Sequence, residues 1–145
     1  MKSHINSGID AERLADFVLF TQRSCILNLS TKLNKDKVSF PQFFLLAYLS
    51  SEEYLTMSDI AQKMGHSTAA ATGLVDRLQD LKFVERVHAV DDRRKIMVRI
   101  TKQGSDLVGK MRGEIANSLS DVMAEMDEDE ADTINHAHKA INRRV

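Results

Sequence analysis

The residues best suited to chemistry in this chain are cationic side chains gathered in one short segment. Residues 86–102 carry six basic side chains against two acids, Asp91 and Asp92. The six are Arg86, Arg93, Arg94, Lys95, Arg99 and Lys102. A phosphate backbone attracts such a local cluster whatever the net charge of the whole chain. The cluster therefore indicates a polyanion-binding element, with an ordinary solvated face as the alternative.

The net charge of −1 hides this cluster, because residues 114–132 hold eight acids and no base. The acids at residues 127–130 begin a predicted helix, where carboxylates complement the positive end of the helix dipole. His136 and His138 lie two residues apart, so a helix places their rings on different faces and they would not share a metal ion. We therefore expect no metal site and no other cofactor.

Motifs of the common enzyme classes are missing from the sequence. It contains no GxSxG, CxxC or HExxH pattern and no phosphate-binding loop, so we expect that the chain is not an enzyme. The single cysteine, Cys25, excludes an internal disulfide and suits a reducing compartment. Because Cys25 falls on an apolar helix face, a small buried hydrophobe is one interpretation and an oxidant sensor is the other.

Length and composition suit one compact domain, or one domain with arms that pack on a second copy of the chain. The chain has 145 residues, of which 43% are hydrophobic and 28% charged. It lacks the stretch of about 18 apolar residues that a membrane span needs. The N-terminus also lacks the apolar run of a secretory signal. We therefore expect a cytoplasmic protein without membrane contact.

Apolar periodicity and helix caps predict six helices and one hairpin. Ser39 and Gln42 have the spacing of a capping box, Thr56 and Ser67 are further N-caps, and Gly65 supplies a chain reversal. Strand-like alternation is confined to residues 83–88 and 96–100, which the charged segment 89–95 joins. The predicted helices span about residues 10–33, 40–49, 57–64, 68–81, 102–126 and 127–143.

The third and fourth predicted helices have the pattern of a helix-turn-helix. The small residue Ala61 stands where the second helix crosses the first, Gly65 makes the turn, and Leu74 anchors the second helix. The predicted inward stripe of that helix is Ala70, Leu74, Leu78 and Leu81. The predicted outward rows are Thr68, Thr72 and Asp76 and, beside them, Ala69, Gly73 and Arg77.

The order of these elements favours DNA binding. The N-terminal half of the second helix would protrude into a DNA major groove, which is about 12 Å wide. The charged hairpin would be the wing beside it, with a basic tip that reaches phosphates or the adjacent minor groove. The sequence therefore predicts a winged helix-turn-helix domain with dimerisation helices at both ends.

Four short stretches carry a more specific resemblance. They are Thr72-Gly73-Leu74-Val75-Asp76-Arg77-Leu78, Val84-Glu85-Arg86, Asp92-Arg93-Arg94, and Ile100-Thr101 with Gly104. Together they resemble the signature of the MarR family of winged helix-turn-helix transcriptional regulators. The resemblance covers essentially the whole chain and implies a single domain, residues 1–145, mainly α with a small β-hairpin. Within it, the winged region would span about residues 40–100, and the dimerisation helices about 10–33 and 101–143.

The resemblance also implies functional residues. Members of the family are homodimers that bind pseudo-palindromic operators. The resemblance implies that Arg94 is the wing arginine and that Asp92 is the carboxylate that orients it. The residues implied to face the groove are Ser67, Thr68, Ala70, Ala71 and Thr72. Further candidate DNA contacts are Gly73 and Arg77 on the recognition helix and Arg86, Arg93 and Lys95 on the wing.

Gly73 departs from the family pattern, in which a polar or basic residue often stands at this position. Glycine inside a helix costs about 0.8–1 kcal/mol relative to alanine. One interpretation is that Gly73 and the alanine run 69–71 allow the backbone to approach DNA closely, while Ser67, Thr68 and Thr72 read bases. The other interpretation is packing against a neighbouring helix.

The function that we expect is a homodimeric, sequence-specific DNA-binding regulator, and more narrowly a repressor. A two-fold dimer would read two half-sites about 10–10.5 base pairs apart. A small-molecule effector would release DNA by binding more tightly to the dimer geometry that does not fit DNA. Candidate walls of the effector pocket are Phe17, Phe20, Phe43 and Tyr48, which suit a plain core equally well. A winged-helix protein-interaction module without DNA binding is the alternative.

Overall fold

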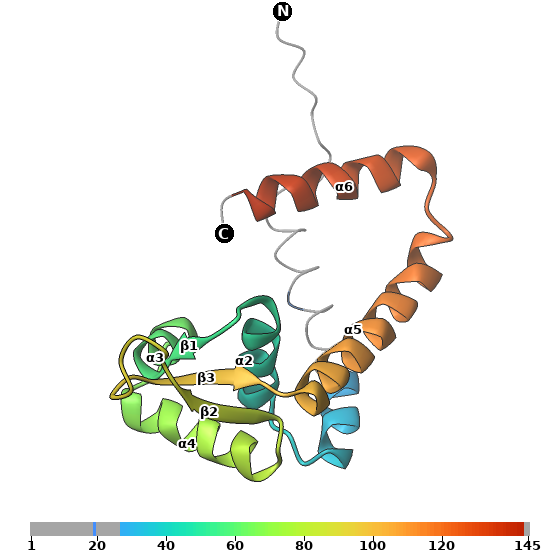
Figure 1. Ribbon diagram of the computed structural model, residues 1–145. Coiled ribbons are helices and arrows are strands. Elements are labelled where there is room, and N and C mark those ends of the chain that lie inside the picture. The colour runs from blue at the N-terminus through green and yellow to red at the C-terminus, as the bar shows by residue number, and fades with distance from the viewer. Residues whose placement is uncertain (1–18, 20–26, 144–145) are drawn as a thin grey trace, which may run out of the picture. The chain divides into compact units, whose positions relative to one another are not determined.

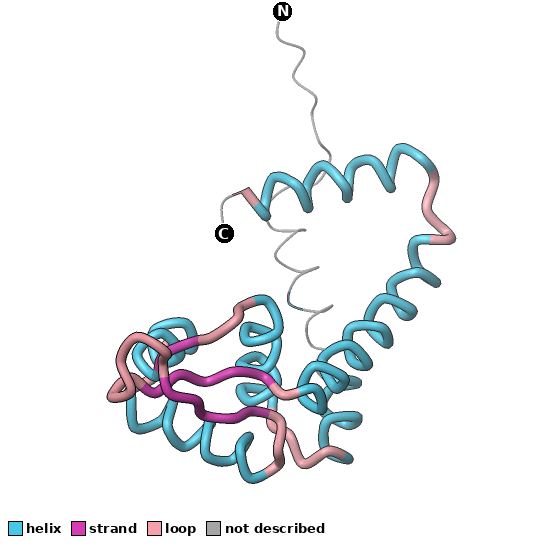
Figure 2. Tube along the Cα trace, viewed as in Figure 1, coloured by secondary structure: helices cyan, strands magenta, loops and turns pink. Residues whose placement is uncertain are grey.

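The computed structural model describes Leu19 and residues 27–143 of the chain (Figure 1). The chain forms two compact units, residues 1–108 and 109–145, and helix α5 (Lys102–Met123) runs from the first unit into the second. After a helical segment over residues 27–35, the elements are α2 Phe40–Ser51, β1 Leu55–Thr56, α3 Met57–Met64, α4 Thr68–Asp80, β2 Val84–His88, β3 Ile96–Ile100, α5 Lys102–Met123 and α6 Glu128–Asn142. The predicted fold class, mainly α with a small β-hairpin, is confirmed (Figure 2).

Local hydrogen bonds begin the helices where the sequence predicts. Before α2, the Ser39 N–H donates to Gln42 Oε1 at 2.8 Å and the Gln42 N–H donates to Ser39 Oγ at 3.4 Å, which confirms the capping box. Before α4, Ser67 Oγ accepts from the Ala70 N–H at 3.2 Å. Between α3 and α4, Gly65 adopts the left-handed conformation with φ 63°, which glycine reaches without steric cost.

The sheet has three antiparallel strands in the order β1-β3-β2, one more than the sequence predicts. Along the hairpin, β2 and β3 pair from Val84 with Ile100 to His88 with Ile96. The additional strand β1 is two residues long, and it pairs Leu55 with Val98 and Thr56 with Met97. A strand this short leaves no alternating pattern in the sequence, which is why it was not predicted.

The core of the first unit lies where α2 packs against β3 and α4, and α4 packs against α3 and β2. Its completely buried side chains include Leu45, Leu46, Leu49, Ile60, Leu78 and Val98. Such a core fixes the helix-turn-helix and the hairpin on one scaffold.

The inward face of α4 differs from the predicted stripe. Ala71, Val75 and Leu78 are completely buried, whereas Ala70 is exposed and Leu74 and Leu81 are half-buried. Only Leu78 is common to the predicted and the observed stripe. The prediction was wrong by about one residue, because the run Ala69–Ala71 and the neighbours Leu74 and Val75 are apolar in either helical phase.

The start of α5 is locked against the loop that leads into β2. The Thr101 hydroxyl donates to the Lys82 carbonyl at 2.8 Å and accepts from the Gly104 N–H at 3.2 Å. A Cβ atom at Gly104 would lie 2.3 Å from the Phe83 carbonyl oxygen and 2.8 Å from Ile100 Cγ1. Only glycine therefore fits at this position without displacing the backbone.

The second unit is helical where the structure describes it. Asp127 and Glu130 cap α6 reciprocally: the Glu130 N–H donates to Asp127 Oδ1 at 2.8 Å, and the Asp127 N–H donates to Glu130 Oε2 at 3.1 Å. Leu119, Met123 and Ile134 are exposed on α5 and α6. Within the described residues, none of the helices combines the length and the apolar character that crossing a membrane requires.

Candidate nucleic-acid interface

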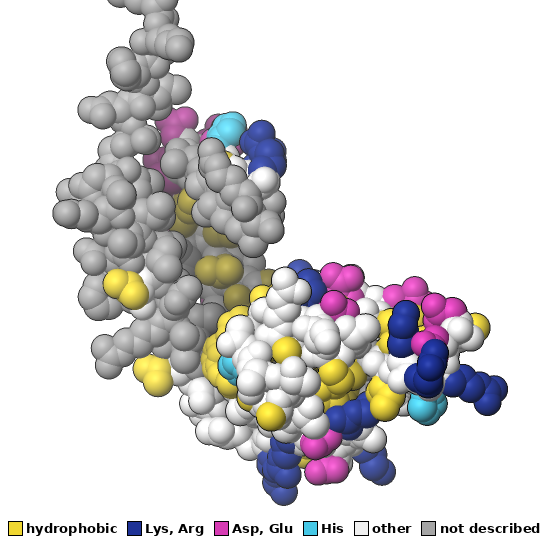
Figure 3. Space-filling view, turned by 90° about the vertical axis from the view of Figure 1, so that its left-hand side faces the viewer, with side chains coloured by type: hydrophobic (Ala, Val, Ile, Leu, Met, Phe, Trp, Pro, Cys, Tyr) yellow, Lys and Arg dark blue, Asp and Glu magenta, His cyan; other side chains and the backbone are white. Residues whose placement is uncertain are grey.

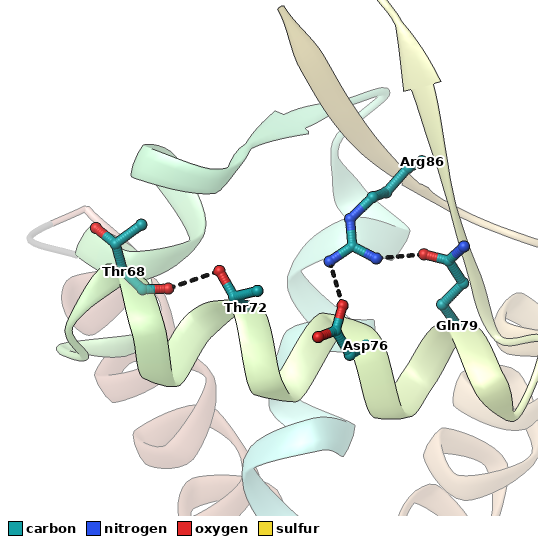
Figure 4. Close-up of polar contacts among 5 residues, drawn as sticks. All are labelled: Thr68, Thr72, Asp76, Gln79 and Arg86. Atoms are coloured by element: carbon teal, nitrogen blue, oxygen red, sulfur yellow. Dashed lines mark hydrogen bonds and ion pairs between the residues drawn. The ribbon is translucent and has the colours of Figure 1, made fainter.

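The N-terminal half of α4 presents small residues to solvent. Ser67, Thr68 and Ala70 are exposed, and Thr72 is half-buried. The Thr72 hydroxyl donates to the Thr68 carbonyl at 2.9 Å (Figure 4). Because its proton is used within the helix, Thr72 offers an incoming ligand its oxygen lone pairs and its methyl group. Ala71 is completely buried, so the expectation that it faces a groove was wrong.

Gly73 lies on the exposed side of α4. A Cβ atom built there would have no heavy atom of the described structure within 4 Å, apart from the neighbouring backbone of its own helix. Packing against any helix that the structure describes in the first unit therefore does not explain this glycine. Arg77, one turn further along, is also exposed.

The wing tip, residues 89–95, is organised by contacts within the tip itself. Asp92 Oδ1 accepts from the Arg94 backbone N–H at 3.0 Å and from Arg94 Nε at 3.2 Å. The Lys95 N–H donates to the Asp92 carbonyl at 3.0 Å, and the Ala89 N–H donates to the Lys95 carbonyl at 3.0 Å. Asp92 thus contacts the Arg94 side chain, as an orienting carboxylate would.

The cations of the wing tip point into solvent. Arg93, Arg94 and Lys95 are exposed, and the Arg94 side chain keeps 92% of its accessible surface. The space-filling view shows Lys and Arg side chains projecting outward, with acidic side chains among them (Figure 3). Val90, for which the sequence pattern predicts no DNA contact, is fully exposed beside these cations.

The wing base, residues 82–86 and 98–104, holds its arginines differently. Arg86 Nη2 lies 2.6 Å from Asp76 Oδ1, and Arg86 Nη1 donates to Gln79 Oε1, so that both arms reach α4 (Figure 4). Its side chain keeps 25% of its accessible surface. On the neighbouring strand, Arg99 Nε lies 2.5 Å from Glu85 Oε1, its partner in the sheet register. The Glu85 carboxylate, together with a hydrogen bond to Tyr54, raises the pKa of Arg99.

The basic cluster therefore separates into two groups. Arg86, Arg99 and Lys102 each pair with a carboxylate outside the wing tip, and for Lys102 that partner is Asp106 at 2.8 Å. Arg93, Arg94 and Lys95 form the exposed group at the tip. These two groups could not be predicted from the sequence, because Asp76 and Arg86 lie ten residues apart and only the fold brings them together.

The candidate effector residues are not brought together by the described structure. Phe17 and Phe20 lie outside the described residues, as does Cys25. Phe43 is buried in the core of the first unit, whereas Tyr48 is exposed with Lys63 Nζ 5.6 Å from its ring centroid. The effector pocket therefore stays a prediction. Among the described residues, no group of three or more His, Cys, Asp or Glu side chains is arranged to hold a metal ion.

Comparison with known proteins places the helix-turn-helix and wing in one family. Residues 37–95 match the family model of the MarR family. The chain is 41% identical over 70 residues to the uncharacterized HTH-type transcriptional regulator YfiV of Bacillus subtilis, covering 48% of this chain and 44% of YfiV. It is 35% identical over 72 residues to the HTH-type transcriptional repressor MdtR of the same organism, covering 50% of this chain and 46% of MdtR. The matched region thus spans less than half of each of these two relatives, which are named as transcriptional regulators and not as enzymes.

Solved structures extend the likeness of fold to most of the chain. RV1404 from Mycobacterium tuberculosis superposes with a TM-score of 0.79 at 20% identity and covers 94% of both chains. A mutant of MepR from Staphylococcus aureus, bound to an oligodeoxyribonucleotide, superposes with a TM-score of 0.67 at 17% identity, covering 90% of this chain and 96% of MepR. The matched family model, the α3–turn–α4 pair and the hairpin that follows it agree: residues 37–95, with the helix-turn-helix and most of the wing, are similar to the MarR family, and the chain has a winged helix-turn-helix fold.

Proposed function

We propose that this chain is a homodimeric, sequence-specific DNA-binding regulator that represses transcription in the cytoplasm. The observation that carries the proposal is that one unit presents two exposed surfaces suited to a duplex. These are the small-residue face of α4 and the cationic wing tip. The first fits a major groove and the second fits phosphates. The repressor named MdtR and the oligonucleotide-bound MepR structure support the proposal by likeness.

Base reading in this proposal rests on short side chains. Ser67 and Thr68 contact base edges, and Thr72 accepts hydrogen bonds or touches a thymine methyl group, since its proton is engaged by Thr68. The exposed backbone at Gly73 then comes close to the duplex. Arg77, Arg93, Arg94 and Lys95 supply the phosphate contacts, which position the protein without reading sequence.

The function can be tested by selecting bound genomic DNA fragments with the purified full-length protein. The affinity for the enriched duplex is then measured. We expect a pseudo-palindromic duplex whose association constant falls steeply as salt is raised, with a log–log slope of about −0.9 per phosphate contacted. Salt-insensitive binding, or no selected duplex, contradicts the proposal and favours the protein-interaction alternative.

Gly73→Ala tests the close approach at α4. Because the site has room for a Cβ atom in the free protein, the variant should fold normally and bind the selected duplex at least about tenfold more weakly. Fluorescence anisotropy measures the affinity, and Ala69→Gly is the matched variant with a side chain removed instead of added. Wild-type affinity in Gly73→Ala would remove the close-approach role.

Dimerisation is supported by the exposed apolar residues of the second unit. Leu119 is 48% exposed, Met123 45% and Ile134 40%, and a second copy would cover such a surface. We expect Leu119→Glu to convert the dimer to a monomer at micromolar concentration in light scattering, while the neighbouring Ser120→Glu leaves it intact. A monomeric wild-type protein would contradict this part of the proposal.

A further inference from the structure

Arg86 is bound to the recognition helix by both arms of its guanidinium group. Nη2 pairs with Asp76 Oδ1 at 2.6 Å and Nη1 donates to Gln79 Oε1, two acceptors that lie three residues apart on α4 (Figure 4). Residues at this spacing are neighbours on a helix surface, so one planar fork can reach both. Three quarters of the side chain's surface is covered, whereas Arg94 is almost completely exposed.

The negative charge of Asp76 also favours Arg86 remaining in this ion pair. Asp76 continues the row of Thr68 and Thr72 on α4, the row that faces the duplex in the proposed function. A carboxylate without a partner on that row would repel DNA phosphates. If Arg86 left Asp76 to bind a phosphate, it would expose this negative charge beside the DNA backbone. The pair therefore favours Arg86 on the protein over Arg86 on the duplex.

The position of Arg86 along β2 makes it a second attachment between wing and helix. The first attachment is the turn of residues 81–83, where Lys82 has φ 64° and the Phe83 N–H donates to the Leu78 carbonyl at 2.9 Å. Arg86 lies three residues further out on the strand. The buried Val84 and Val98 fix the inner end of the hairpin in the core, and the Arg86 contact restrains the strand two residues beyond Val84.

We infer that Arg86 is a positioning residue, which holds the wing at a fixed angle to α4 and is not itself a phosphate ligand. This inference rests on the proposed function and deepens it. The recognition helix and the wing tip must engage one duplex at the same time, and a fixed angle pre-organises both for that contact.

A double-mutant cycle on the selected duplex separates positioning from direct contact. Arg86→Gln should weaken binding by about tenfold in the wild-type background, but by less than about threefold in an Asp76→Ala background, because the partner is already lost. If Arg86 contacted phosphate directly, its substitution would cost as much or more in the Asp76→Ala background. That result overturns the inference.

Conservative variants give an independent comparison. Arg86→Lys keeps the charge but loses the fork that reaches two acceptors, so it should bind as weakly as Arg86→Gln. Arg94→Lys at the wing tip is the matched control and should keep most of the wild-type affinity, since a lysine can still reach phosphate. Near-wild-type binding by Arg86→Lys, with the same melting temperature, would overturn the inference.

Hydrogen–deuterium exchange tests the positioning role without DNA. In the full-length protein, amides of residues 87–97 should exchange at least about threefold faster in Arg86→Gln and Arg86→Lys than in the wild type or in Arg94→Gln. Unchanged exchange in both Arg86 variants overturns the inference. Faster exchange in a protein that binds no duplex would contradict the proposed function alone, so the two failures are distinguishable.

Discussion

The base and the tip of the wing use the same residue types for different purposes. At the base, Arg86 is bound by two α4 side chains, and Gly104 fits against the Phe83 carbonyl. At the tip, Arg94 contacts Asp92 two residues away and is otherwise open to solvent. The difference teaches that an arginine's role follows from its partners and its exposure more than from its place in a basic cluster.

The largest effect is expected at Gly104 in the wing base. Gly104→Ala places a Cβ atom 2.3 Å from the backbone oxygen of Phe83, so the turn and the start of α5 must separate. The free energy of unfolding should fall by about 1–3 kcal/mol, the usual cost of overpacking. Urea denaturation at pH 7 measures it.

Gly73→Ala is the matched control for this prediction. The same methyl group is added to a helix, but into open space, so the protein should gain about 0.8–1 kcal/mol from helix propensity. Equal effects at the two glycines would show that the wing base is not tightly packed against α5.

The next prediction distinguishes the wing tip from the wing base by an effect on DNA binding instead of an effect on stability. Arg94→Gln should leave the unfolding free energy unchanged, because the side chain is exposed and its ion pair is local. It should weaken binding to the selected duplex and to an unrelated duplex by similar factors. It should also reduce the slope of the salt dependence by the amount expected for about one phosphate contact. Arg112→Gln, which removes an exposed charge from α5, is the control. An unaltered salt dependence in Arg94→Gln would contradict the assignment of the tip.

The smallest effect concerns the cap of α3, where β1 joins the wing sheet. The Thr56 hydroxyl and backbone N–H donate to Asp59 Oδ2 at 2.7 and 3.0 Å, and these bonds hold the pKa of Asp59 below its ordinary value of 3.8. Removing the cap with Thr56→Ala should cost about 1 kcal/mol at pH 7. Ser58→Ala is the control substitution in the same turn.

The cost of Thr56→Ala should depend on pH in one direction. A carboxyl group whose pKa is lowered by folding contributes stability that is complete above its unfolded pKa and is lost as the pH falls through the folded pKa. The difference between wild type and Thr56→Ala should therefore be largest above about pH 5 and shrink below 3.8. Urea denaturation at pH 7 and pH 3 provides the two values, and a difference that grows at pH 3 would contradict the cap assignment.

The parts of the fold that short-range chemistry determines could be predicted from the sequence. The caps at Ser39, Thr56 and Ser67 and the turn at Gly65 depend on residues within three or four positions of one another. Their hydrogen bonds form whenever the local backbone does, so residue type and spacing suffice. The hairpin strands follow in the same way from alternation over five residues each.

The parts that long-range packing determines could not be predicted. The inward phase of α4 depends on what Ala71 and Val75 meet across the core, and the neighbouring apolar residues fit either phase. The partners of Arg86 lie on another element, and the need for glycine at position 104 arises from a carbonyl 21 residues earlier in the chain. The sequence identifies these residues as notable but not the contacts that decide their roles.

The short strand β1 has a mechanical consequence for the wing. It pairs with Met97 and Val98 only, so the sheet is three strands wide at these two residues and two strands wide on either side, at Ile96 and at Arg99–Ile100. Two-stranded ribbons twist more than wider sheets and are less stable on their own. At the inner end, the buried Phe83 and Val84 hold the ribbon in alignment. Bending compliance therefore rises toward the outer end of the hairpin, beyond β1, which can adapt to surfaces of differing curvature.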